Sequence, residues 1–311
     1  MPIAVVVAAD VDPSLIELLL RDDRFAAELR PVRSEKEIAG IVGHCRALIT
    51  RHHNQVTRHV FDAAPALEVI VQGTSGLDNI DHSAASERGI AILGNPGGNA
   101  NAVAELVIGQ MIALTRTLRR YDDEVHSGVW SRDDCGTRRE LSGYRLGIVG
   151  LGTVGRIVAR LAAGFGMAPL AFDPYVDDEE IARRGARKAA SLEALMRESD
   201  VVTLHVPLTP ETRGMIGARE LALLPSGAFL INTSRGHVVD LDALLAAIES
   251  NALGGAALDV FPDEPPRREW TRDPRLLLTP HIAGCSSEAK SSIARSVYET
   301  LCRFYDLEPR P

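Results

Sequence analysis

The feature that most constrains the fold of this chain is a glycine-rich segment near its middle. An apolar run from Arg145 leads into glycines at positions 150, 152 and 155, and a further apolar run with helical character follows. The pattern indicates a strand that turns tightly at Gly150, lets a pyrophosphate approach the main chain at Gly152, and packs its helix closely at Gly155. Because the first turn of such a helix presents free NH groups to phosphates, the segment predicts a dinucleotide site.

An acidic residue at the end of the next expected strand indicates which dinucleotide binds. The strand Pro169 to Asp173 places a carboxylate where the hydroxyls of an adenosine ribose can donate hydrogen bonds. An NADP site would need a cation for the additional phosphate, but Pro174, Tyr175 and Val176 follow instead. The sequence therefore predicts NAD as the cofactor. The alternative to a dinucleotide site is a glycine-rich turn with a purely structural role.

Length and charge set limits on the rest of the molecule. The chain has 311 residues, of which 45% are hydrophobic and 24% are charged, as expected for a soluble globular protein with two domains. The net charge of −8 comes without a long basic cluster, so nucleic acid is not an expected partner. No apolar run reaches membrane-spanning length. The apolar segment from Met1 to Ala9 lacks the positively charged region of a signal peptide, and it predicts a first strand.

Cysteine and histidine spacing argues against disulfides and against a metal site. The cysteines lie far apart without CxxC spacing, at Cys45, Cys135, Cys285 and Cys302. This usage is typical of a reducing compartment, so we expect a cytoplasmic protein. His205, His237 and His281 also lack the spacing of metal ligands, and no metal is predicted.

Alternating strands and helices occur twice along the chain and predict the architecture. In the first third, a helical stretch such as Ser14 to Leu20 separates β-branched runs at Ile3 to Ala9, Ala47 to Thr50, Val69 to Gln72 and Ile90 to Leu93. Six further strands are expected near residues 145, 170, 201, 229, 256 and 276, the number in a complete dinucleotide-binding sheet. The pattern predicts an α/β fold with doubly wound parallel sheets.

A glycine-rich break from Gly94 to Gly98 separates the two halves. The run Asn99 to Arg120 follows with apolar residues at helical spacing, and it predicts a helix entered through a hinge. Because this run has more apolar surface than a one-sided amphipathic helix needs, we expect a buried domain or subunit contact, and we expect the chain to form a homodimer through it. A last amphipathic helix, Ser286 to Phe304, is expected to return to the first domain.

The motifs of the chain, in their order, resemble those of the D-isomer-specific 2-hydroxyacid dehydrogenase family over nearly the full length. Besides the glycine segment they are Gly76 to Asp81, Asn99 with Val103 to Glu105, Asn232 to Gly236, Asp259 to Pro265, and Thr279 to Gly284. The resemblance implies a Rossmann NAD-binding domain, residues 97–285, inserted into a flavodoxin-like substrate domain of residues 1–96 plus 286–311.

The resemblance also implies a catalytic set of Arg235, Glu264 and His281 in an interdomain cleft beside the nicotinamide. Reduction of a 2-oxo acid needs a hydride at the carbonyl carbon and a proton at its oxygen, and the imidazole of His281 suits that proton transfer. Glu264 is expected to orient the ring and favour its charged form. The guanidinium of Arg235 can hold the substrate carboxylate at two points and polarise the carbonyl. The alternative for each of these three residues, taken singly, is an exposed side chain with no role in catalysis.

Further residues are assigned to the cofactor and the substrate by the same resemblance. The expected cofactor contacts are Val103, Gly150, Gly152, Thr153, Val154, Gly155, Asp173, Val206, Pro207, Thr233, Ser234, Asp259, Ala283 and Gly284. The expected substrate contacts are Arg51, His52, Ser75 and Gly76. The loop of Arg51 to Asn54 carries a cation and two imidazoles, which suggests a substrate with a polar or anionic tail. A solvated turn is the alternative for the two histidines.

Three functions are compatible with these patterns. The main prediction is an NAD-dependent oxidoreductase that transfers a hydride between nicotinamide and a small D-2-hydroxy acid or 2-oxo acid. A narrower alternative is a 3-phosphoglycerate dehydrogenase of serine synthesis. Family members with that substrate commonly carry an arginine where Gln72 stands here, which counts against this alternative. Arg51, in contrast, favours a substrate that carries a phosphate. A non-enzymatic NAD-sensing module, as in corepressors that resemble the family, ranks last because the catalytic set is complete.

Overall fold

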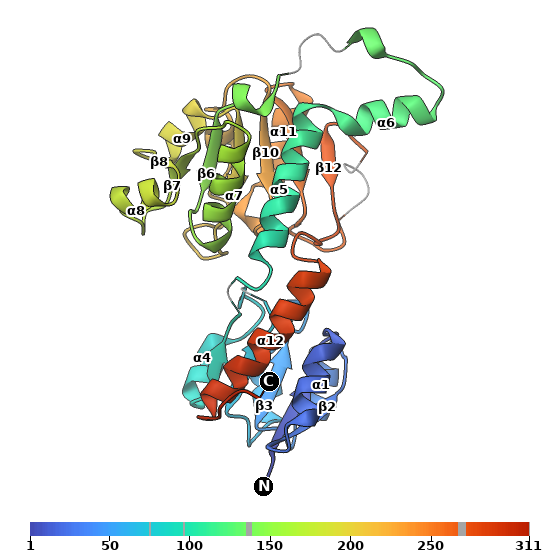
Figure 1. Cartoon of the computed structure of the whole chain (residues 1–311), viewed down its shortest axis with the longest axis vertical. Helices are drawn as coiled ribbons and strands as arrows, with labels where there is room; N and C mark the ends of the chain where they lie inside the picture. The colour runs from blue at the N-terminus through green and yellow to red at the C-terminus, as the bar shows by residue number, and fades with distance from the viewer. Residues whose placement is uncertain (75, 96, 135–138, 267–271, 311) are drawn as a thin grey trace. The chain divides into compact units, whose positions relative to one another are not determined.

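The computed structural model describes residues 1–74, 76–95, 97–134, 139–266 and 272–310. Its contacts divide the chain into two compact units (Figure 1). Unit 1 comprises Met1–Asn99 and Cys285–Pro311, and unit 2 comprises Ala100–Gly284. In the described residues, no helix is both long enough and apolar enough to cross a membrane.

Unit 1 is built on a five-stranded sheet in which every neighbouring pair is parallel. Its strands are β1 (Ile3–Val7), β2 (Phe25–Leu29), β3 (Ala47–Thr50), β4 (Val69–Gln72) and β5 (Ala91–Leu93). They lie in the order β2-β1-β3-β4-β5, which is the flavodoxin-like order. The central strands β3 and β4 are buried along their whole length, as parallel strands covered on both faces are.

Helices cover both faces of this sheet. α1 (Pro13–Arg21) and α12 (Ser287–Phe304) pack together on one face (Figure 1), so the prediction that the last helix returns to the first domain is confirmed. The helices in the core of the other face are α2 (Glu35–Ile41), α3 (Arg58–Asp62) and α4 (His82–Glu87). Side chains alternate between the two cores, with Val5 in one and Val6 in the other.

Unit 2 contains a seven-stranded sheet, again with parallel neighbours throughout. Its strands are β6 (Leu146–Val149), β7 (Leu170–Phe172), β8 (Arg187–Lys188), β9 (Val201–Leu204), β10 (Ala228–Asn232), β11 (Leu253–Leu258) and β12 (Leu276–Leu278). The order is β12-β11-β10-β9-β6-β7-β8, so the chain reverses its direction of winding between β6 and β9, as in Rossmann sheets. The predicted architecture of doubly wound parallel sheets is confirmed.

Several sequence predictions about elements are wrong in detail. The sheet of unit 2 has seven strands rather than six, because the short edge strand β8 has no apolar run that marks it. In unit 1, β2 is also absent from the predicted strands, and of its residues only Phe25 is buried. Both are edge strands, which need few apolar residues because one side faces solvent. The expected strand Ile3 to Ala9 ends earlier, at Val7.

Unit 2 has helices that flank this sheet and one, Leu118–His126, that has no buried residue. They are α5 (Ala100–Thr115), α6 (Leu118–His126), α7 (Thr153–Gly164), α8 (Asp178–Arg183), α9 (Leu192–Glu198), α10 (Ala218–Leu221) and α11 (Leu241–Glu249). The prediction of one helix from Asn99 to Arg120 is wrong, because Thr117 has a left-handed backbone with φ of 52° and separates α5 from α6. The apolar surface of α5 is buried against α7 and the sheet (Figure 1).

Candidate active site

The predicted site residues of unit 2 gather at one edge of its sheet. Because all seven strands are parallel, the loops after their last residues share that edge. These loops carry Gly150 after β6, Asp173 after β7, Val206 and Pro207 after β9, Thr233, Ser234 and Arg235 after β10, Asp259 and Glu264 after β11, and His281, Ala283 and Gly284 after β12. The edge includes the reversal point between β6 and β9, where open α/β sheets bind ligands.

The three glycines after β6 have different surroundings. Gly150 has φ of 88°, and a Cβ atom there would lie 2.6 Å from the carbonyl oxygen of His205. A Cβ atom at Gly155 would lie 2.2 Å from the carbonyl oxygen of Gly150, whereas one at Gly152 would meet no atom within 4 Å. Gly150 and Gly155 therefore allow close packing of the loop and helix, and Gly152 leaves the main chain open to a ligand.

The groups around this loop fit a dinucleotide. Helix α7 begins at Thr153, and its N-cap residue, Gly152, has no side chain to cap the NH groups of the first turn, so these donors suit phosphate oxygens. The carboxylate of Asp173 accepts hydrogen bonds from the NH groups of Leu151 at 2.9 Å and Tyr175 at 3.0 Å. It thereby fixes the glycine loop, and each oxygen keeps a lone pair for a ribose hydroxyl.

Two residues after the neighbouring strands complete this region. The hydroxyl oxygen of Thr233 is buried and has no hydrogen-bond partner among the described residues, which suits a polar ligand group. The His205 ring lies 3.0 Å from the hydroxyl of Thr203, and desolvation lowers the pKa of His205 to about 3. His205 is therefore neutral at physiological pH.

His281 and Glu264 form a hydrogen-bonded pair. The Nδ1 atom of His281 lies 2.8 Å from Oε2 of Glu264, and both side chains are partly exposed. The other carboxylate oxygen, Oε1, accepts a hydrogen bond from the NH of Phe261 at 3.2 Å. The carboxylate is thus oriented by the main chain, and it orients the imidazole ring in turn.

Asp259 holds the segment that carries His281. Its side chain is fully buried, and its carboxylate accepts hydrogen bonds from the hydroxyl of Thr279 at 2.5 Å and from the NH groups of Ile282 and Ala283 at 2.9 and 2.8 Å. The NH of His281 also donates to the carbonyl of Asp259 at 2.8 Å. Within this frame His281 has a left-handed φ of 54°, which costs about 1 kcal/mol for such a residue.

A glycine contact brings the loop of Arg235 against the loop of Glu264. A Cβ atom at Gly236 would lie 2.0 Å from the carbonyl carbon of Phe261, so only glycine allows this backbone approach. The side-chain amide of Asn232 donates to the carbonyl of Arg235 at 2.9 Å and fixes its backbone. The three expected catalytic residues therefore lie on neighbouring loops of one sheet edge.

One buried residue near the site is absent from the sequence predictions. Gln110 on α5 is 2% exposed, and its amide nitrogen lies 3.4 Å from the Thr279 hydroxyl that binds Asp259. It therefore supports the same segment. The signal in the sequence is a polar residue within an otherwise apolar run, between Ile108 and Met111. Val103, an expected cofactor contact, is buried in the first turn of the same helix.

Unit 1 carries the expected substrate residues. Arg51 and His52 follow β3 and Gly76 lies beyond the end of β4, whereas Ser75 lies outside the described residues. The rings of His52 and His53 contact each other edge to face at 5.3 Å. Desolvation, with a smaller effect from Arg51, lowers the pKa of His53.

Gln72 has an internal structural role at the end of β4. Its side chain is fully buried, and its amide nitrogen donates to the side chain of Asn79 at 2.7 Å and to the carbonyl of Gly76 at 3.1 Å. Its amide oxygen accepts a hydrogen bond from Thr50 at 2.5 Å. Gln72 therefore fixes the Gly76 loop and has no group directed to a phosphate.

Comparison with known proteins gives consistent matches. A family model described as D-isomer specific 2-hydroxyacid dehydrogenase, NAD binding domain, matches residues 108–283. The D-3-phosphoglycerate dehydrogenase of Synechocystis sp. is 38% identical over 270 residues, which cover 86% of this chain and 48% of that protein. The glyoxylate reductase of Thermococcus litoralis is 38% identical over 265 residues, which cover 83% of this chain and 80% of that protein.

Solved structures agree with these sequence matches. The D-lactate dehydrogenase from Aquifex aeolicus, complexed with NAD and lactic acid, has a TM-score of 0.87 and 27% identity, and the match covers 97% of this chain and 95% of that one. The present chain spans between 48% and 64% of the length of several of the D-3-phosphoglycerate dehydrogenases that it matches.

Proposed function

Because the chain belongs to the D-isomer specific 2-hydroxyacid dehydrogenase family, we propose that it is an NAD-dependent oxidoreductase that interconverts a small D-2-hydroxy acid and its 2-oxo acid. The observation that carries this proposal is the His281–Glu264 pair, which lies at the same sheet edge as the glycine loop after β6. A proton donor and a dinucleotide site at one edge are the two parts that reduction of a carbonyl needs.

NAD is the cofactor of unit 2, and the chain has groups that suit each of its parts. The NH groups at the start of α7 suit the pyrophosphate, the carboxylate of Asp173 suits the adenosine ribose, and the buried hydroxyl of Thr233 suits a polar group of the cofactor. When bound, the nicotinamide supplies the hydride for reduction or accepts it in oxidation. We propose that the other expected contacts, from Val206 and Pro207 to Ala283 and Gly284, line the same cofactor.

His281 is proposed as the acid and base of the reaction. In the direction of reduction its protonated ring donates a proton to the carbonyl oxygen of the substrate, and in oxidation the neutral ring removes the hydroxyl proton. Glu264 keeps the ring oriented through Nδ1 and favours its charged form before the proton is donated.

Arg235 is proposed to bind the carboxylate of the substrate. Its planar guanidinium can donate two parallel hydrogen bonds to a carboxylate and still polarise the adjacent carbonyl. The backbone of Arg235 is held by Asn232 and by the close contact at Gly236, so the residue starts from a fixed position. We propose that unit 1 is the substrate domain, in which Arg51, His52 and the main chain at Ser75 and Gly76 bind the rest of the substrate.

A 3-phosphoglycerate dehydrogenase is the second candidate. The 38% identical relative from Synechocystis sp. carries that name, and Arg51 could bind a phosphate. The internal hydrogen bonds of Gln72 count against a phosphate clamp at the end of β4. Rates of NADH oxidation with glyoxylate, hydroxypyruvate and 3-phosphohydroxypyruvate, repeated with NADPH, test both candidates. The main proposal predicts turnover with NADH on an unphosphorylated acid, and turnover confined to 3-phosphohydroxypyruvate would favour the alternative.

We propose that the protein is a cytoplasmic homodimer. The apolar surface of α5 is used inside unit 2, but Leu118 and Val125 on α6 and Val129 and Trp130 beyond it are exposed. Such a patch suits contact with a second copy. Cys45 and Cys302 are buried free thiols, which fits a reducing compartment. Sedimentation as a monomer at micromolar concentration would exclude the dimer.

A further inference from the structure

One residue of the glycine loop after β6 is held by groups from outside the loop. The NH of Leu151 donates to the carboxylate of Asp173 at 2.9 Å, and the carbonyl oxygen of Leu151 accepts a hydrogen bond from Nη1 of Arg184 at 2.6 Å. Leu151 lies between Gly150 and Gly152, and its side chain is fully buried. The loop is therefore fixed at the NH, the carbonyl and the side chain of Leu151.

The position of Arg184 is itself fixed by helix α8. Arg184 is the residue that follows the last turn of this helix, and its Nε atom donates to the carboxylate of Glu180 at 2.6 Å. Ile181, on the same helix, is buried in the apolar core that also contains Leu151. The side chain of Arg184 is 25% exposed. It therefore connects a packed helix to the glycine loop.

The hydrogen bond from Arg184 also sets the direction of the next NH group. The peptide bond between Leu151 and Gly152 is trans, and in a planar trans peptide the carbonyl and the NH point in opposite directions. Because the carbonyl of Leu151 points toward Arg184, the NH of Gly152 points away from it. No acceptor in the described main chain binds this NH, so it is available to a ligand.

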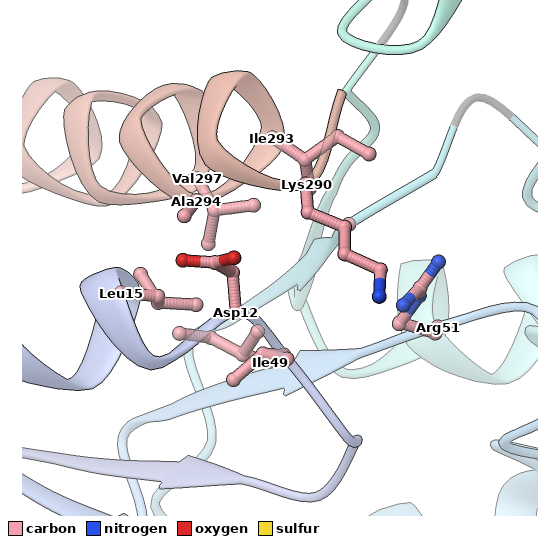
Figure 2. Close-up of a pocket in the computed structure, with 10 residues that line it drawn as sticks. Asp12, Leu15, Ile49, Arg51, Lys290, Ile293, Ala294 and Val297 are labelled. Atoms are coloured by element: carbon pink, nitrogen blue, oxygen red, sulfur yellow. The ribbon is translucent and has the colours of Figure 1, made fainter. Parts of the chain in front are cut away.

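The loop after β1 in unit 1 lacks this combination. There Nη1 of Arg51 donates to the carbonyl of Asp10 at 3.3 Å, and Figure 2 shows Arg51 and Asp12 among the side chains that line a pocket at this edge of the sheet. This loop has no glycine, and Asp12 caps the start of α1 by accepting the NH of Ser14 at 3.0 Å. Unit 2, in contrast, combines a loop carbonyl bound by arginine with a helix start that has glycine as its N-cap.

We propose that Arg184 is a positioning residue for the pyrophosphate of NAD. Through the carbonyl of Leu151 it holds the NH of Gly152 in an orientation in which that NH can donate to a phosphate oxygen. A donor that is already oriented binds its ligand more tightly, because less conformational freedom is lost on binding. Arg184 lies 33 residues from Leu151 in the chain, so the glycine motif does not mark it. The role concerns the cofactor and holds for any acid that the protein reduces.

Two neighbouring arginines provide a variant and a matched control. Arg184→Met keeps an apolar stem and removes the guanidinium. Arg183→Met changes the adjacent residue, which is 66% exposed and pairs with the same Glu180 at 2.7 Å. Both changes remove one positive charge and one ion pair with Glu180, whereas the change at position 184 also removes the hydrogen bond to Leu151.

Calorimetric titration with ADP and with adenosine tests the role without turnover. The two ligands share the adenine and the ribose and differ by the pyrophosphate. We expect Arg184→Met to raise the Kd for ADP about tenfold, as loss of one charged hydrogen bond does, and to leave the Kd for adenosine unchanged. Arg184→Lys keeps a cationic donor and should fall between Arg184→Met and the wild type. Arg183→Met should bind both ligands as the wild type does.

Three results of this titration would overturn the role of Arg184. They are an unchanged Kd for ADP in Arg184→Met, an equal loss of affinity for ADP and adenosine, and an equal loss of affinity for ADP in Arg183→Met. The second would show that Arg184 supports the fold or the adenosine part of the site. The third would show an effect of charge alone.

Steady-state kinetics give an independent measurement and separate this proposal from the proposed function. In Arg184→Met the KM for NADH should rise by a factor similar to that for ADP, with kcat at saturating NADH nearly unchanged, because Arg184 is not among the residues expected to act on the substrate. A lower kcat with an unchanged KM would contradict the positioning role. Protein that binds ADP as expected but reduces no 2-oxo acid would contradict the proposed function instead.

Discussion

At the scale of single residues, His281 is held in a backbone conformation that it would not choose alone. Its φ of 54° lies in the left-handed region, and the hydrogen bonds that Thr279, Ile282 and Ala283 donate to the carboxylate of Asp259 hold the surrounding segment. Several hydrogen bonds to one buried carboxylate, each contributing on the order of 1 kcal/mol or more, offset that cost. The position of the ring is therefore fixed before any substrate binds.

Glu264→Gln changes the charge next to this ring and keeps the shape of the side chain. A neutral amide lacks the negative charge that attracts a cationic ring, so reductive activity should decline at a lower pH than in the wild type. The measurement is the pH profile of kcat/KM for reduction. Asp263→Asn, at the exposed neighbouring position, is the control and should leave the profile in place. A profile in Glu264→Gln that matches the wild type would remove the proposed role of Glu264.

The residues of the candidate site differ in how far the sequence could predict them. Arg235, Glu264 and His281 follow expected strands within specific motifs, so their gathering at one edge follows from parallel strands. The anchoring role of Asp259 and the support from Gln110 depend on contacts between segments far apart in the chain. Periodicity and local motifs carry no information on such contacts.

At the scale of elements, the strands that could be predicted from the sequence are those with a run of apolar residues. The buried strands β3, β4, β6 and β9 have apolar runs and lie where the sequence places them. The edge strands β2 and β8 are half exposed or very short and lack that signal. The division between α5 and α6 at Thr117 has no glycine or proline to mark it, so local propensity predicts one continuous helix there.

The edge strand β2 begins beside a buried ionic group that predicts a pH dependence. The carboxylate of Asp22 accepts hydrogen bonds from Arg24 at 2.6 and 2.7 Å and from the hydroxyl of Tyr298 on α12 at 2.9 Å. The bonds from Arg24, followed by that from Tyr298, lower the pKa of Asp22 to about 2. Because the carboxyl of the unfolded chain has a higher pKa, ionised Asp22 stabilises the fold above about pH 4, and that stabilisation is lost as the pH falls toward 2.

Asp22→Asn should therefore lower the free energy of unfolding by about 2 kcal/mol at pH 7, and the difference from the wild type should shrink as the pH falls from 4 toward 2. Urea unfolding at several pH values measures this difference. Asp23→Asn removes a neighbouring carboxylate that is 83% exposed and pairs with Arg310, and it should cost much less. A difference between wild type and Asp22→Asn that stays constant down to pH 2 would contradict the account.

At the scale of the whole molecule, each of the two units carries a different group of the residues that the proposed reaction requires. Unit 2 carries the NAD site and the expected catalytic residues, and unit 1 carries the expected substrate residues. Both sheets use the carboxyl ends of parallel strands for these groups. Each sheet reverses its direction of winding once, in unit 2 between β6 and β9 and in unit 1 between β1 and β3, and open α/β sheets bind ligands at such points.

The most direct test of the account is the rate of NADH oxidation by the wild type and by His281→Asn, with a panel of small 2-oxo acids, together with the affinity of each protein for NADH. We expect the wild type to turn over at least one acid, and we expect His281→Asn to lose about 100-fold or more in kcat while it binds NADH as tightly as the wild type. Wild-type protein that oxidises NADH with none of the acids, or a His281→Asn variant with unchanged kcat, would contradict it.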